Sequence, residues 1–194
     1  ISVAYNGISQ KMLEEGNASR IKEKIVLSVG TFNVRKNHQN LVRGYLNSNI
    51  SKEYSLVMIG DKNKIFKDGG IEEDMLKGGN VKIIPSLNED ELIDLYKKAE
   101  IVVSLSLYEG FGIPLLEGLY NRCKIVCSDI PVYREVYGQY ATFCNPIDTD
   151  DIGKVLAIAS TKDTPSQEEI GRLLQQYSYE KSARTMIENI VPGY

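Results

Sequence analysis

Two glutamates, Glu109 and Glu117, bracket a glycine-containing turn in the stretch 101–117. The turn follows the apolar run 101–105, which predicts a strand buried on both faces. Pro114 stands at the first position of a helix expected after the turn. A strand, a glycine loop and a helix start together aim backbone N–H groups and a positive dipole end at an anion. Because carboxylates would repel that anion, we expect the two glutamates to bind neutral hydroxyls beside it. An anion surrounded by hydroxyls is a sugar nucleotide.

The elements that position this turn alternate between strand and helix patterns. Apolar runs predict strands at 25–29, 54–59, 81–84, 101–105, 124–128 and 140–143. Helical spacing and helix-start signals predict helices at 41–46, 71–76, 89–99, 152–159, 166–176 and 178–190, besides the helix that begins at Pro114. This order predicts an α/β fold with a Rossmann-like, doubly wound parallel sheet of about six strands. Ligands of such sheets bind at the carboxyl ends of the strands.

Two adjacent cations, Arg35 and Lys36, lie in the polar loop after the strand 25–29. They therefore stand at the carboxyl end of a strand, where an anionic ligand would meet them. Taken alone, the pair is typical of a solvated loop; together with the two glutamates, a phosphate-binding role is the better interpretation. His38 is the only histidine and stands at an expected helix start, so we interpret it as a structural or surface residue.

Composition and charge exclude several classes of protein. The chain has 194 residues, enough for one domain with a core, and its net charge of −3 without a basic block argues against a nucleic-acid surface. No apolar run approaches the roughly 20 residues of a membrane span, and the first residues do not resemble a signal peptide. Cys123, Cys127 and Cys144 are predicted to be reduced thiols in or beside strands, which fits a reducing cytosol.

Two other kinds of site fit the sequence less well. An NAD-binding sheet would carry G-x-G-x-x-G after its first strand, where only Gly30 is present. The triplet Asp148-Thr149-Asp150 could hold a divalent metal, but it stands at an expected helix start, where aspartates are favoured as caps. We therefore predict no metal site.

The segment 109–117, EGFGIPLLE, resembles the E-x7-E signature of retaining glycosyltransferases with the GT-B fold. It is most similar to glycosyltransferase family 4, also called group 1. The loop after the first strand resembles the family motif whose basic residues contact the donor diphosphate. In that motif Lys36 matches the family's lysine and Arg35 belongs to an Arg-Lys-Asn variant, while Thr31 stands where many members carry arginine.

Two further segments carry the resemblance, which covers nearly all of the chain. The segment 128–136 resembles a family segment of the form S-(N/D)-x-P-x-x-x-E-V, in which Arg134 and Glu135 are expected to brace the sheet. The segment 177–183 resembles the start of the family's C-terminal helix. One departure is Arg122, which replaces the usual glycine before a strand and leaves the local turn and the substrate preference open.

The resemblance implies a domain organisation. Residues 1–194 would form the C-terminal, nucleotide-sugar-binding half of a GT-B fold, with 1–24 as the interdomain connection and 178–191 as the helix that crosses back onto the other domain. The N-terminal acceptor domain would be absent from this chain, which would then transfer nothing alone. The implied location is the cytoplasm, with peripheral contact of the full-length enzyme at the inner face of the membrane.

The resemblance also implies a reaction and its residues. A sugar would pass from a UDP-, GDP- or ADP-sugar to a glycan or lipid-linked acceptor, with retention and without a metal cofactor. Glu109 and Lys36 would be the catalytic residues. The donor-binding residues would be Gly30, Thr31, Arg35, Lys36, Pro85, Gly110, Phe111, Gly112, Ile113 and Glu117. Two alternatives stay open: a double displacement with Glu109 as nucleophile, and a non-catalytic nucleotide-binding or interaction module that is inactive without a partner domain.

Overall fold

A parallel six-stranded sheet forms the centre of the computed structural model, which describes residues 3–17, 21–60, 71, 76 and 80–190. All five strand pairs are parallel, in the order β3-β2-β1-β4-β5-β6. The strands are β1 (Glu23–Val29), β2 (Ser55–Ile59), β3 (Val81–Ile84), β4 (Ala99–Ser104), β5 (Lys124–Ser128) and β6 (Ala141–Cys144). The predicted doubly wound α/β fold is therefore confirmed.

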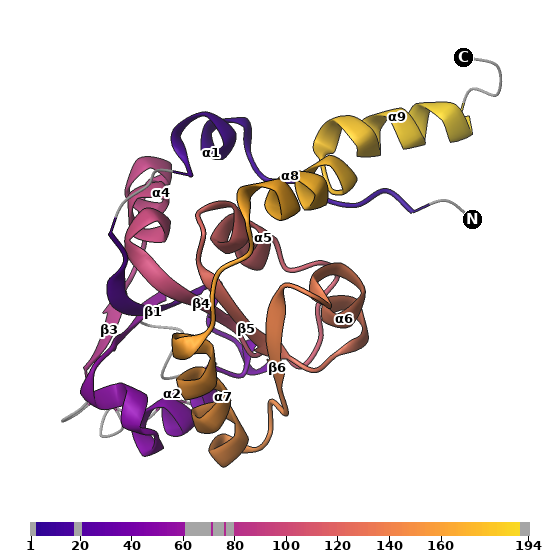
Figure 1. Ribbon diagram of the computed structural model, residues 1–194. Coiled ribbons are helices and arrows are strands. Elements are labelled where there is room, and N and C mark those ends of the chain that lie inside the picture. Colours follow the sequence, from indigo (N-terminus) through magenta and orange to yellow (C-terminus); the bar gives the residue numbers. More distant parts are fainter. Residues whose placement is uncertain (1–2, 18–20, 61–70, 72–75, 77–79, 191–194) are drawn as a thin grey trace.

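Helices cover both faces of this sheet (Figure 1). They are α1 (Gln10–Glu15), the 3-10 turn η1 (Val34–Lys36), α2 (His38–Asn47), η2 (Asn49–Lys52), α4 (Glu89–Lys98), α5 (Ile113–Tyr120), α6 (Pro131–Tyr137), α7 (Thr149–Thr161), α8 (Gln167–Gln176) and α9 (Tyr179–Ile190). Successive strand residues enter opposite cores, because side chains alternate across a strand. Leu27 belongs to the core that contains residues of α1, α4, α5, α6 and α8, whereas the preceding Val26 belongs to the core that contains residues of α2 and α7.

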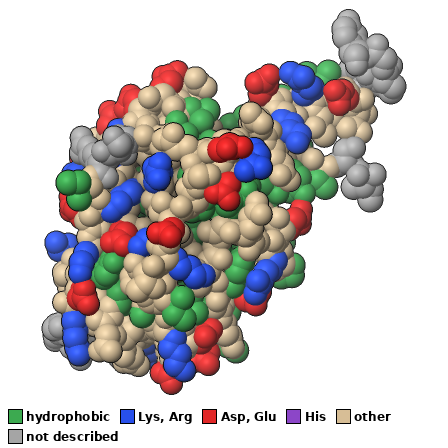
Figure 2. Space-filling model, viewed as in Figure 1, with side chains coloured by type: hydrophobic (Ala, Val, Ile, Leu, Met, Phe, Trp, Pro, Cys, Tyr) green, Lys and Arg blue, Asp and Glu red, His purple; other side chains and the backbone are tan. Residues whose placement is uncertain are grey.

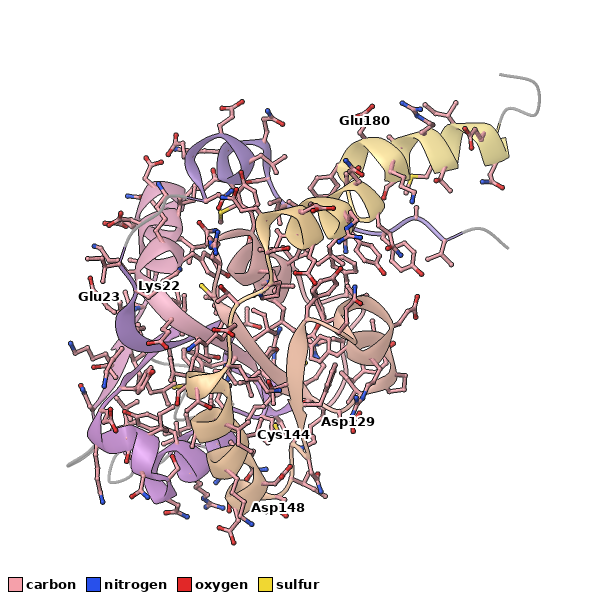
Figure 3. All side chains as sticks on the ribbon, in the orientation of Figure 1. Lys22, Glu23, Asp129, Cys144, Asp148 and Glu180 are labelled. Carbon is pink, nitrogen blue, oxygen red and sulfur yellow. The ribbon has the colours of Figure 1, made fainter. Side chains whose placement is uncertain are left out.

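Side-chain caps explain where several helices begin. Asn88 and Glu91 form a reciprocal capping box at the start of α4, and Ser166 caps α8 in the same way. Asp148 lies at the start of α7 (Figure 3) and accepts hydrogen bonds from the amides of Asp150 and Asp151. The D-x-D triplet thus supplies a helix cap, and the described residues contain no cluster of histidine, cysteine and acidic side chains suited to a metal.

Two local features were not predicted, and one prediction cannot be compared with the structure. Residues 3–9 form no strand, and the polar stretch after them is helix α1, held by the Ser9 cap and by Met12 in the core. Lys22 donates to the Tyr96 and Asn121 carbonyls at the ends of α4 and α5 (Figure 3). The helix predicted at 71–76 lies mostly outside the described residues.

Arg122 adopts the left-handed backbone conformation, with φ of 60°. This is the conformation for which glycine is favoured, since a Cβ atom costs energy there. Arg122 therefore holds, in the turn before β5, a backbone conformation that a glycine would adopt at lower cost. The three cysteines are free and buried, as predicted.

Helix α9 projects from the body of the molecule, with the N-terminal segment beside it (Figure 1). The Ser182 hydroxyl donates to the Tyr5 carbonyl and joins the two. Positive and negative side chains are interspersed over the face shown in Figure 2, and neither sign dominates it. Among the described helices, none has the length and apolarity required to cross a bilayer.

Candidate active site

The candidate site lies where the order of successive strands in the parallel sheet changes direction. Strands β1, β2 and β3 run outward on one side and β4, β5 and β6 on the other, so the switch point lies between β1 and β4. Open α/β sheets bind ligands outside the carboxyl ends of the strands at this point. The loops after β1 and β4 meet there: the Leu107 amide donates to the Arg35 carbonyl at 2.9 Å, and Arg35 Nη1 donates to the Tyr108 carbonyl at 2.7 Å.

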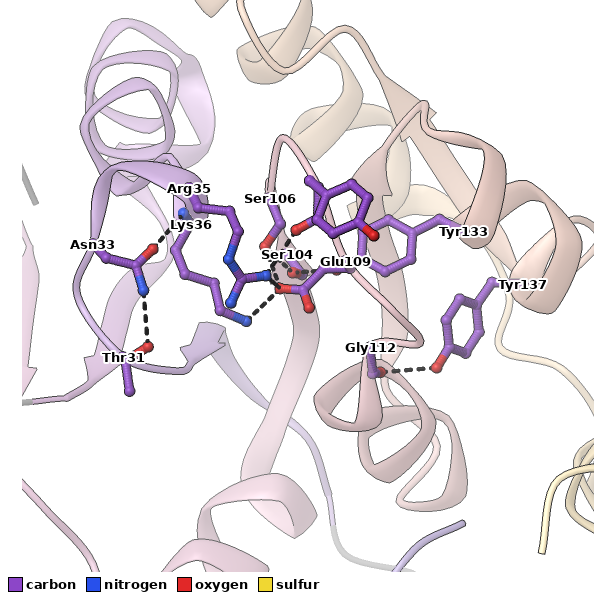
Figure 4. A network of polar contacts seen from close by, with 11 residues as sticks. Thr31, Asn33, Arg35, Lys36, Ser104, Ser106, Glu109, Gly112, Tyr133 and Tyr137 are labelled. Atoms are coloured by element: carbon purple, nitrogen blue, oxygen red, sulfur yellow. Dashed lines mark hydrogen bonds and ion pairs between the residues drawn. The ribbon is translucent and has the colours of Figure 1, made fainter. Parts of the chain in front are cut away.

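The meeting of these loops brings Arg35, Lys36 and Glu109 together (Figure 4). One oxygen, Glu109 Oε1, lies 2.6 Å from Lys36 Nζ and 2.9 Å from Arg35 Nη1. It also accepts a hydrogen bond of 2.9 Å from Ser106 Oγ. The side chains of Lys36 and Glu109 are only 15% and 12% exposed, so this ion pair is largely shielded from water. The two predicted catalytic residues are therefore in direct contact.

Burial raises the pKa of Glu109, but hydrogen bonds from Lys36, Ser106 and Arg35 more than offset it, and the pKa lies below its ordinary value. The carboxylate is therefore ionised at neutral pH. An ionised group with three donors on one oxygen is a strong acceptor held in a fixed place.

The loop after β1 is shaped to present Lys36. The Asn33 side chain accepts from the Lys36 amide at 3.1 Å, and a hydrogen bond of 3.1 Å joins Asn33 to Thr31. Gly30 has φ of +155°, and a Cβ atom there would lie 3.3 Å from Lys36 Cε. Gly30 thus leaves space for the lysine side chain.

The glycine loop before α5 is braced from behind by helix α6. Gly112 has φ of +91°, and a Cβ atom there would lie 2.6 Å from a ring carbon of Tyr133. Tyr137 donates to the Gly112 carbonyl at 2.8 Å. Gly110 is exposed, and a Cβ atom there would have no neighbour within 4 Å. The loop backbone is therefore accessible at Gly110 and held in place by α6 at Gly112. Ile113 follows at the start of α5.

Phe111 contributes to this site through its backbone alone. Its side chain is 4% exposed and packs among Tyr5, Tyr137 and Tyr177. The aromatic cluster anchors the loop to α6, to the chain end of α8 and to the N-terminal segment. A ligand at this loop could meet the Phe111 amide but not its ring.

Glu117 lies further along α5, outside the contacts of Arg35 and Lys36. Its Oε2 atom accepts a hydrogen bond of 2.7 Å from the hydroxyl of Tyr96, which is fully buried on α4. Burial raises the pKa of Glu117, and the Tyr96 hydrogen bond only partly opposes this. Pro85 is exposed at the carboxyl end of β3, on the same edge of the sheet but two strands from β1.

Three other ionisable residues that the sequence analysis singled out, His38, Arg134 and Glu135, make contacts within the fold. His38 is 3% exposed, packs against Phe32 in a tilted arrangement with ring centroids 4.6 Å apart, and has a pKa lowered to about 4 by burial and by Lys36. It is therefore neutral at pH 7, as befits its predicted structural role. Arg134 forms two hydrogen bonds with Asp129, at 2.6 and 2.7 Å, and Glu135 accepts from the Tyr5 hydroxyl.

Four hydroxyl-bearing residues behind the site were missed at the sequence level. Ser106, Ser104 and Tyr133 form a line that ends at Glu109, Tyr137 holds Gly112, and both tyrosines come from α6 (Figure 4). Tyr133 and Tyr137 are four residues apart, about one helical turn, and this spacing indicates that both side chains face the same loop. Nothing in the local sequence links that turn to 104–112.

Comparisons with known proteins agree with this architecture. The family model of glycosyl transferases group 1 matches residues 10–187. The O-antigen chain mannosyltransferase RfbU of Salmonella typhimurium is 30% identical over 150 residues, which are 76% of this chain and 41% of that protein. An N-acetylgalactosamine-N,N'-diacetylbacillosaminyl-diphospho-undecaprenol 4-alpha-N-acetylgalactosaminyltransferase of Campylobacter jejuni is 31% identical over 138 residues, 66% of this chain and 33% of that protein. The chain thus spans less than half the length of these two relatives.

Solved structures show the same fold at lower identity. A glycosyltransferase from Rickettsia africae has a TM-score of 0.73 at 18% identity, over 96% of this chain and 55% of that one. An alpha,alpha-trehalose-phosphate synthase (UDP-forming) from Burkholderia xenovorans has a TM-score of 0.72 at 15% identity, over 87% and 44%. With a family model that matches residues 10–187, the chain belongs to the glycosyl transferases group 1 family.

Proposed function

We propose that this chain is the donor-binding domain of a glycosyltransferase that moves a sugar from a nucleoside diphosphate to an acceptor hydroxyl, with retention at the anomeric carbon. The observation that carries the proposal is the convergence of Lys36, Arg35 and Glu109 at the switch point of the sheet. Two cations suit a diphosphate, and a carboxylate suits sugar hydroxyls.

In the reaction, the acceptor oxygen bonds to the anomeric carbon while the bond from that carbon to the phosphate oxygen breaks. The bonding electron pair leaves with the diphosphate, and the acceptor's proton passes to the departing phosphate oxygen. Lys36, Arg35 and the amides at the start of α5 stabilise the charge that gathers there. This arrangement supplies positive charge from the protein itself, and we propose that no metal cofactor is needed.

Glu109 changes partners during binding. In the donor-free site it pairs with both cations and offsets one of their two charges, and a diphosphate, with more negative charge, draws them to itself. The released carboxylate then accepts hydrogen bonds from the hydroxyls of the transferred sugar, and Glu117 accepts from the ribose. Backbone groups of the two loops would contact the donor, at Gly30, Thr31, Gly110, Phe111, Gly112 and Ile113. Pro85 lies at the turn that would meet the nucleotide base.

The names of the relatives support a proposal for the class of sugar and acceptor. RfbU is named a mannosyltransferase, and the Campylobacter relative a transferase that acts on a diphospho-undecaprenol-linked sugar. We therefore propose a hexose donor carried by GDP, UDP or ADP and a glycan or lipid-linked acceptor. With a lipid-linked acceptor, the reaction would occur at the cytoplasmic face of a membrane. The whole protein would then contact that membrane peripherally.

We further propose that the acceptor domain contacts helix α9. The side chains of Tyr179, Met186 and Ile187 are 52%, 53% and 54% exposed. Their spacing of seven and eight residues places them on one helix face, which projects from the body of the domain. A second domain over this face, with 1–24 as the connection and 178–191 as the crossing helix, would bury them.

The direct test is release of nucleoside diphosphate by the intact protein from GDP-mannose and from UDP-N-acetylgalactosamine, with the anomeric configuration of the product read by NMR. We expect one donor to be used, and Lys36→Ala to lower turnover about 100- to 1,000-fold, as loss of a charge-stabilising donor does. Lys154→Ala removes an exposed lysine on α7 and should leave turnover unchanged. A protein that binds nucleotide but never turns over would instead be the non-catalytic module.

A further inference from the structure

A line of hydroxyls reaches Glu109 from the end of β4 and from helix α6 (Figure 4). Ser106 Oγ lies 2.9 Å from Glu109 Oε1, Ser104 Oγ lies 3.4 Å from Ser106 Oγ, and Tyr133 Oη lies 2.8 Å from Ser104 Oγ. Ser106 and Tyr133 are both 0% exposed. We call the hydroxyls of Tyr133, Ser104 and Ser106 the hydroxyl chain.

The direction of these hydrogen bonds follows from the ionised carboxylate. A carboxylate only accepts, so Ser106 must donate to Glu109. The Ser106 proton is then committed, which makes Ser104 the donor to Ser106. By the same reasoning Tyr133 donates to Ser104. The hydroxyl chain is thus a directed series of donors that begins at a fully buried tyrosine and ends at the carboxylate.

The hydroxyl chain and the cations have different freedom to move. Arg35 is exposed, with 43% of its side chain accessible, and Lys36 has a flexible four-carbon stem. Both can turn to a diphosphate. The hydroxyl chain is fixed in the core between β4 and α6, where the Tyr133 ring also lies against Gly112. When a donor takes the cations, Ser106 is the contact that stays.

We propose that the hydroxyl chain positions the Glu109 carboxylate toward the transferred sugar once the donor diphosphate has drawn the two cations away. Its members are positioning residues, because they act through Glu109. This inference rests on the proposed function and adds to it the residues that keep the glutamate oriented during the reaction.

The test compares Ser106→Ala and Tyr133→Phe with wild type in the intact protein, by nucleotide release from GDP-mannose or UDP-N-acetylgalactosamine. We expect kcat to fall about 10- to 100-fold in Ser106→Ala and about 3- to 10-fold in Tyr133→Phe, because a hydrogen bond to a charged group is lost directly or weakened. The KM for the donor should change less than about threefold, since the diphosphate and ribose contacts remain.

The pH profile separates positioning from a general loss of stability. The ionisable groups that face Glu109 are Arg35 and Lys36 from the loop after β1, and Tyr133 from α6 across the serines. Removing the Ser106 donor raises the pKa of Glu109, so the acidic limb of kcat/KM moves to higher pH in Ser106→Ala. Tyr45→Phe is the matched control: it removes a buried tyrosine hydroxyl in the opposite core and should leave both kcat and the acidic limb unchanged.

The outcomes are distinct. An active wild type whose kcat stays within about twofold in both variants, or falls equally in Tyr45→Phe, overturns the inference alone. A wild type that releases nucleotide from neither donor overturns the proposed function, and the inference with it. If Ser106→Ala does not fold, Tyr133→Phe decides, because it removes one oxygen and keeps the ring under Gly112.

Discussion

At the scale of single residues, the two glutamates of the site lie in opposite environments. Three donors hold the pKa of Glu109 below its ordinary value despite burial, whereas burial raises the pKa of Glu117, for which Tyr96 is the one side-chain donor among the residues that the structure describes. When their environments move the pKa values of two carboxyl groups in opposite directions, the two groups are suited to different roles. Glu109 is anchored as an anion next to the cations, and Glu117 is an acceptor kept short of donors, which ribose hydroxyls would supply.

Replacement of Glu117 by glutamine should stabilise the free protein and weaken nucleotide binding. Because the folded-state pKa is raised, the ionised carboxylate costs stability: the favourable contribution of its protonated form is present below the unfolded-state pKa and is lost as the pH rises through the folded-state pKa. At pH 7 we expect Glu117→Gln to raise the free energy of unfolding by about 1 kcal/mol. Urea unfolding measures this, with Glu168→Gln on the exposed face of α8 as a neutral control.

A Glu117→Gln protein that was less stable than wild type at pH 7 would contradict the unfavourable burial of the ionised Glu117 carboxylate. The amide can still accept the Tyr96 hydrogen bond, so loss of that contact would not explain such a result.

The site residues differ in how far sequence could predict them. Lys36, Glu109 and Glu117 stand in contiguous motifs at strand ends, so their position on one edge followed from the order of elements. The ion pair between Lys36 and Glu109 did not follow, because their sequence separation of 73 leaves the distance between them undetermined. The hydroxyl chain was missed for the same reason: Tyr133 joins Ser104 across 29 residues and two elements.

At the scale of elements, the left-handed Gly112 fixes the turn from β4 into α5. A Cβ atom there would meet Tyr133 at 2.6 Å in addition to the backbone strain of φ +91°. We expect Gly112→Ala to destabilise the protein by about 2 kcal/mol, combining the strain with a clash against a ring that cannot easily move. Thermal unfolding provides the measurement.

Gly110→Ala is the matched control, two residues earlier in the same loop. Its Cβ atom would meet nothing within 4 Å, so stability should change by less than about 0.5 kcal/mol. If both substitutions destabilised the protein equally, the close contact between Gly112 and Tyr133 would not be the cause.

Helix boundaries were predictable where a cap marks them and unpredictable where none was recognised. Asn88, Ser166 and Asp148 each precede a helix that begins within a few residues of its predicted start. Helix α1 has six residues and one fully buried side chain, Met12, which is too little for a helical period to show. Tertiary contact, rather than local pattern, decides that segment.

At the scale of the whole molecule, buried His38 links stability to pH. Its pKa falls from 6.5 to about 4, mainly because burial disfavours the charged form. The stability it contributes is therefore present above pH 6.5 and is lost as the pH falls toward 4. The difference is worth on the order of 3 kcal/mol.

Unfolding by urea at pH 7 and at pH 4.5 should show this in comparison with His38→Gln. Because other groups titrate equally in both proteins, the change in the wild type minus that in the variant isolates His38. We expect the wild type to lose about 2 kcal/mol more than the variant over this range. Parallel losses would mean that His38 is hydrated in the folded state.

We propose that the carboxyl edge of the sheet between β1 and β4 binds a nucleoside diphosphate through Lys36 and Glu117. Calorimetric titration of the intact protein with UDP, GDP and ADP, in EDTA and then with Mg²⁺, tests it most directly. We expect one nucleotide to bind without metal, and Lys36→Ala and Glu117→Ala each to weaken it about tenfold or more, while Lys154→Ala binds as wild type. Nucleotide binding that survived both substitutions would contradict a donor site at this edge. So would the absence of binding by all three nucleotides up to millimolar concentration.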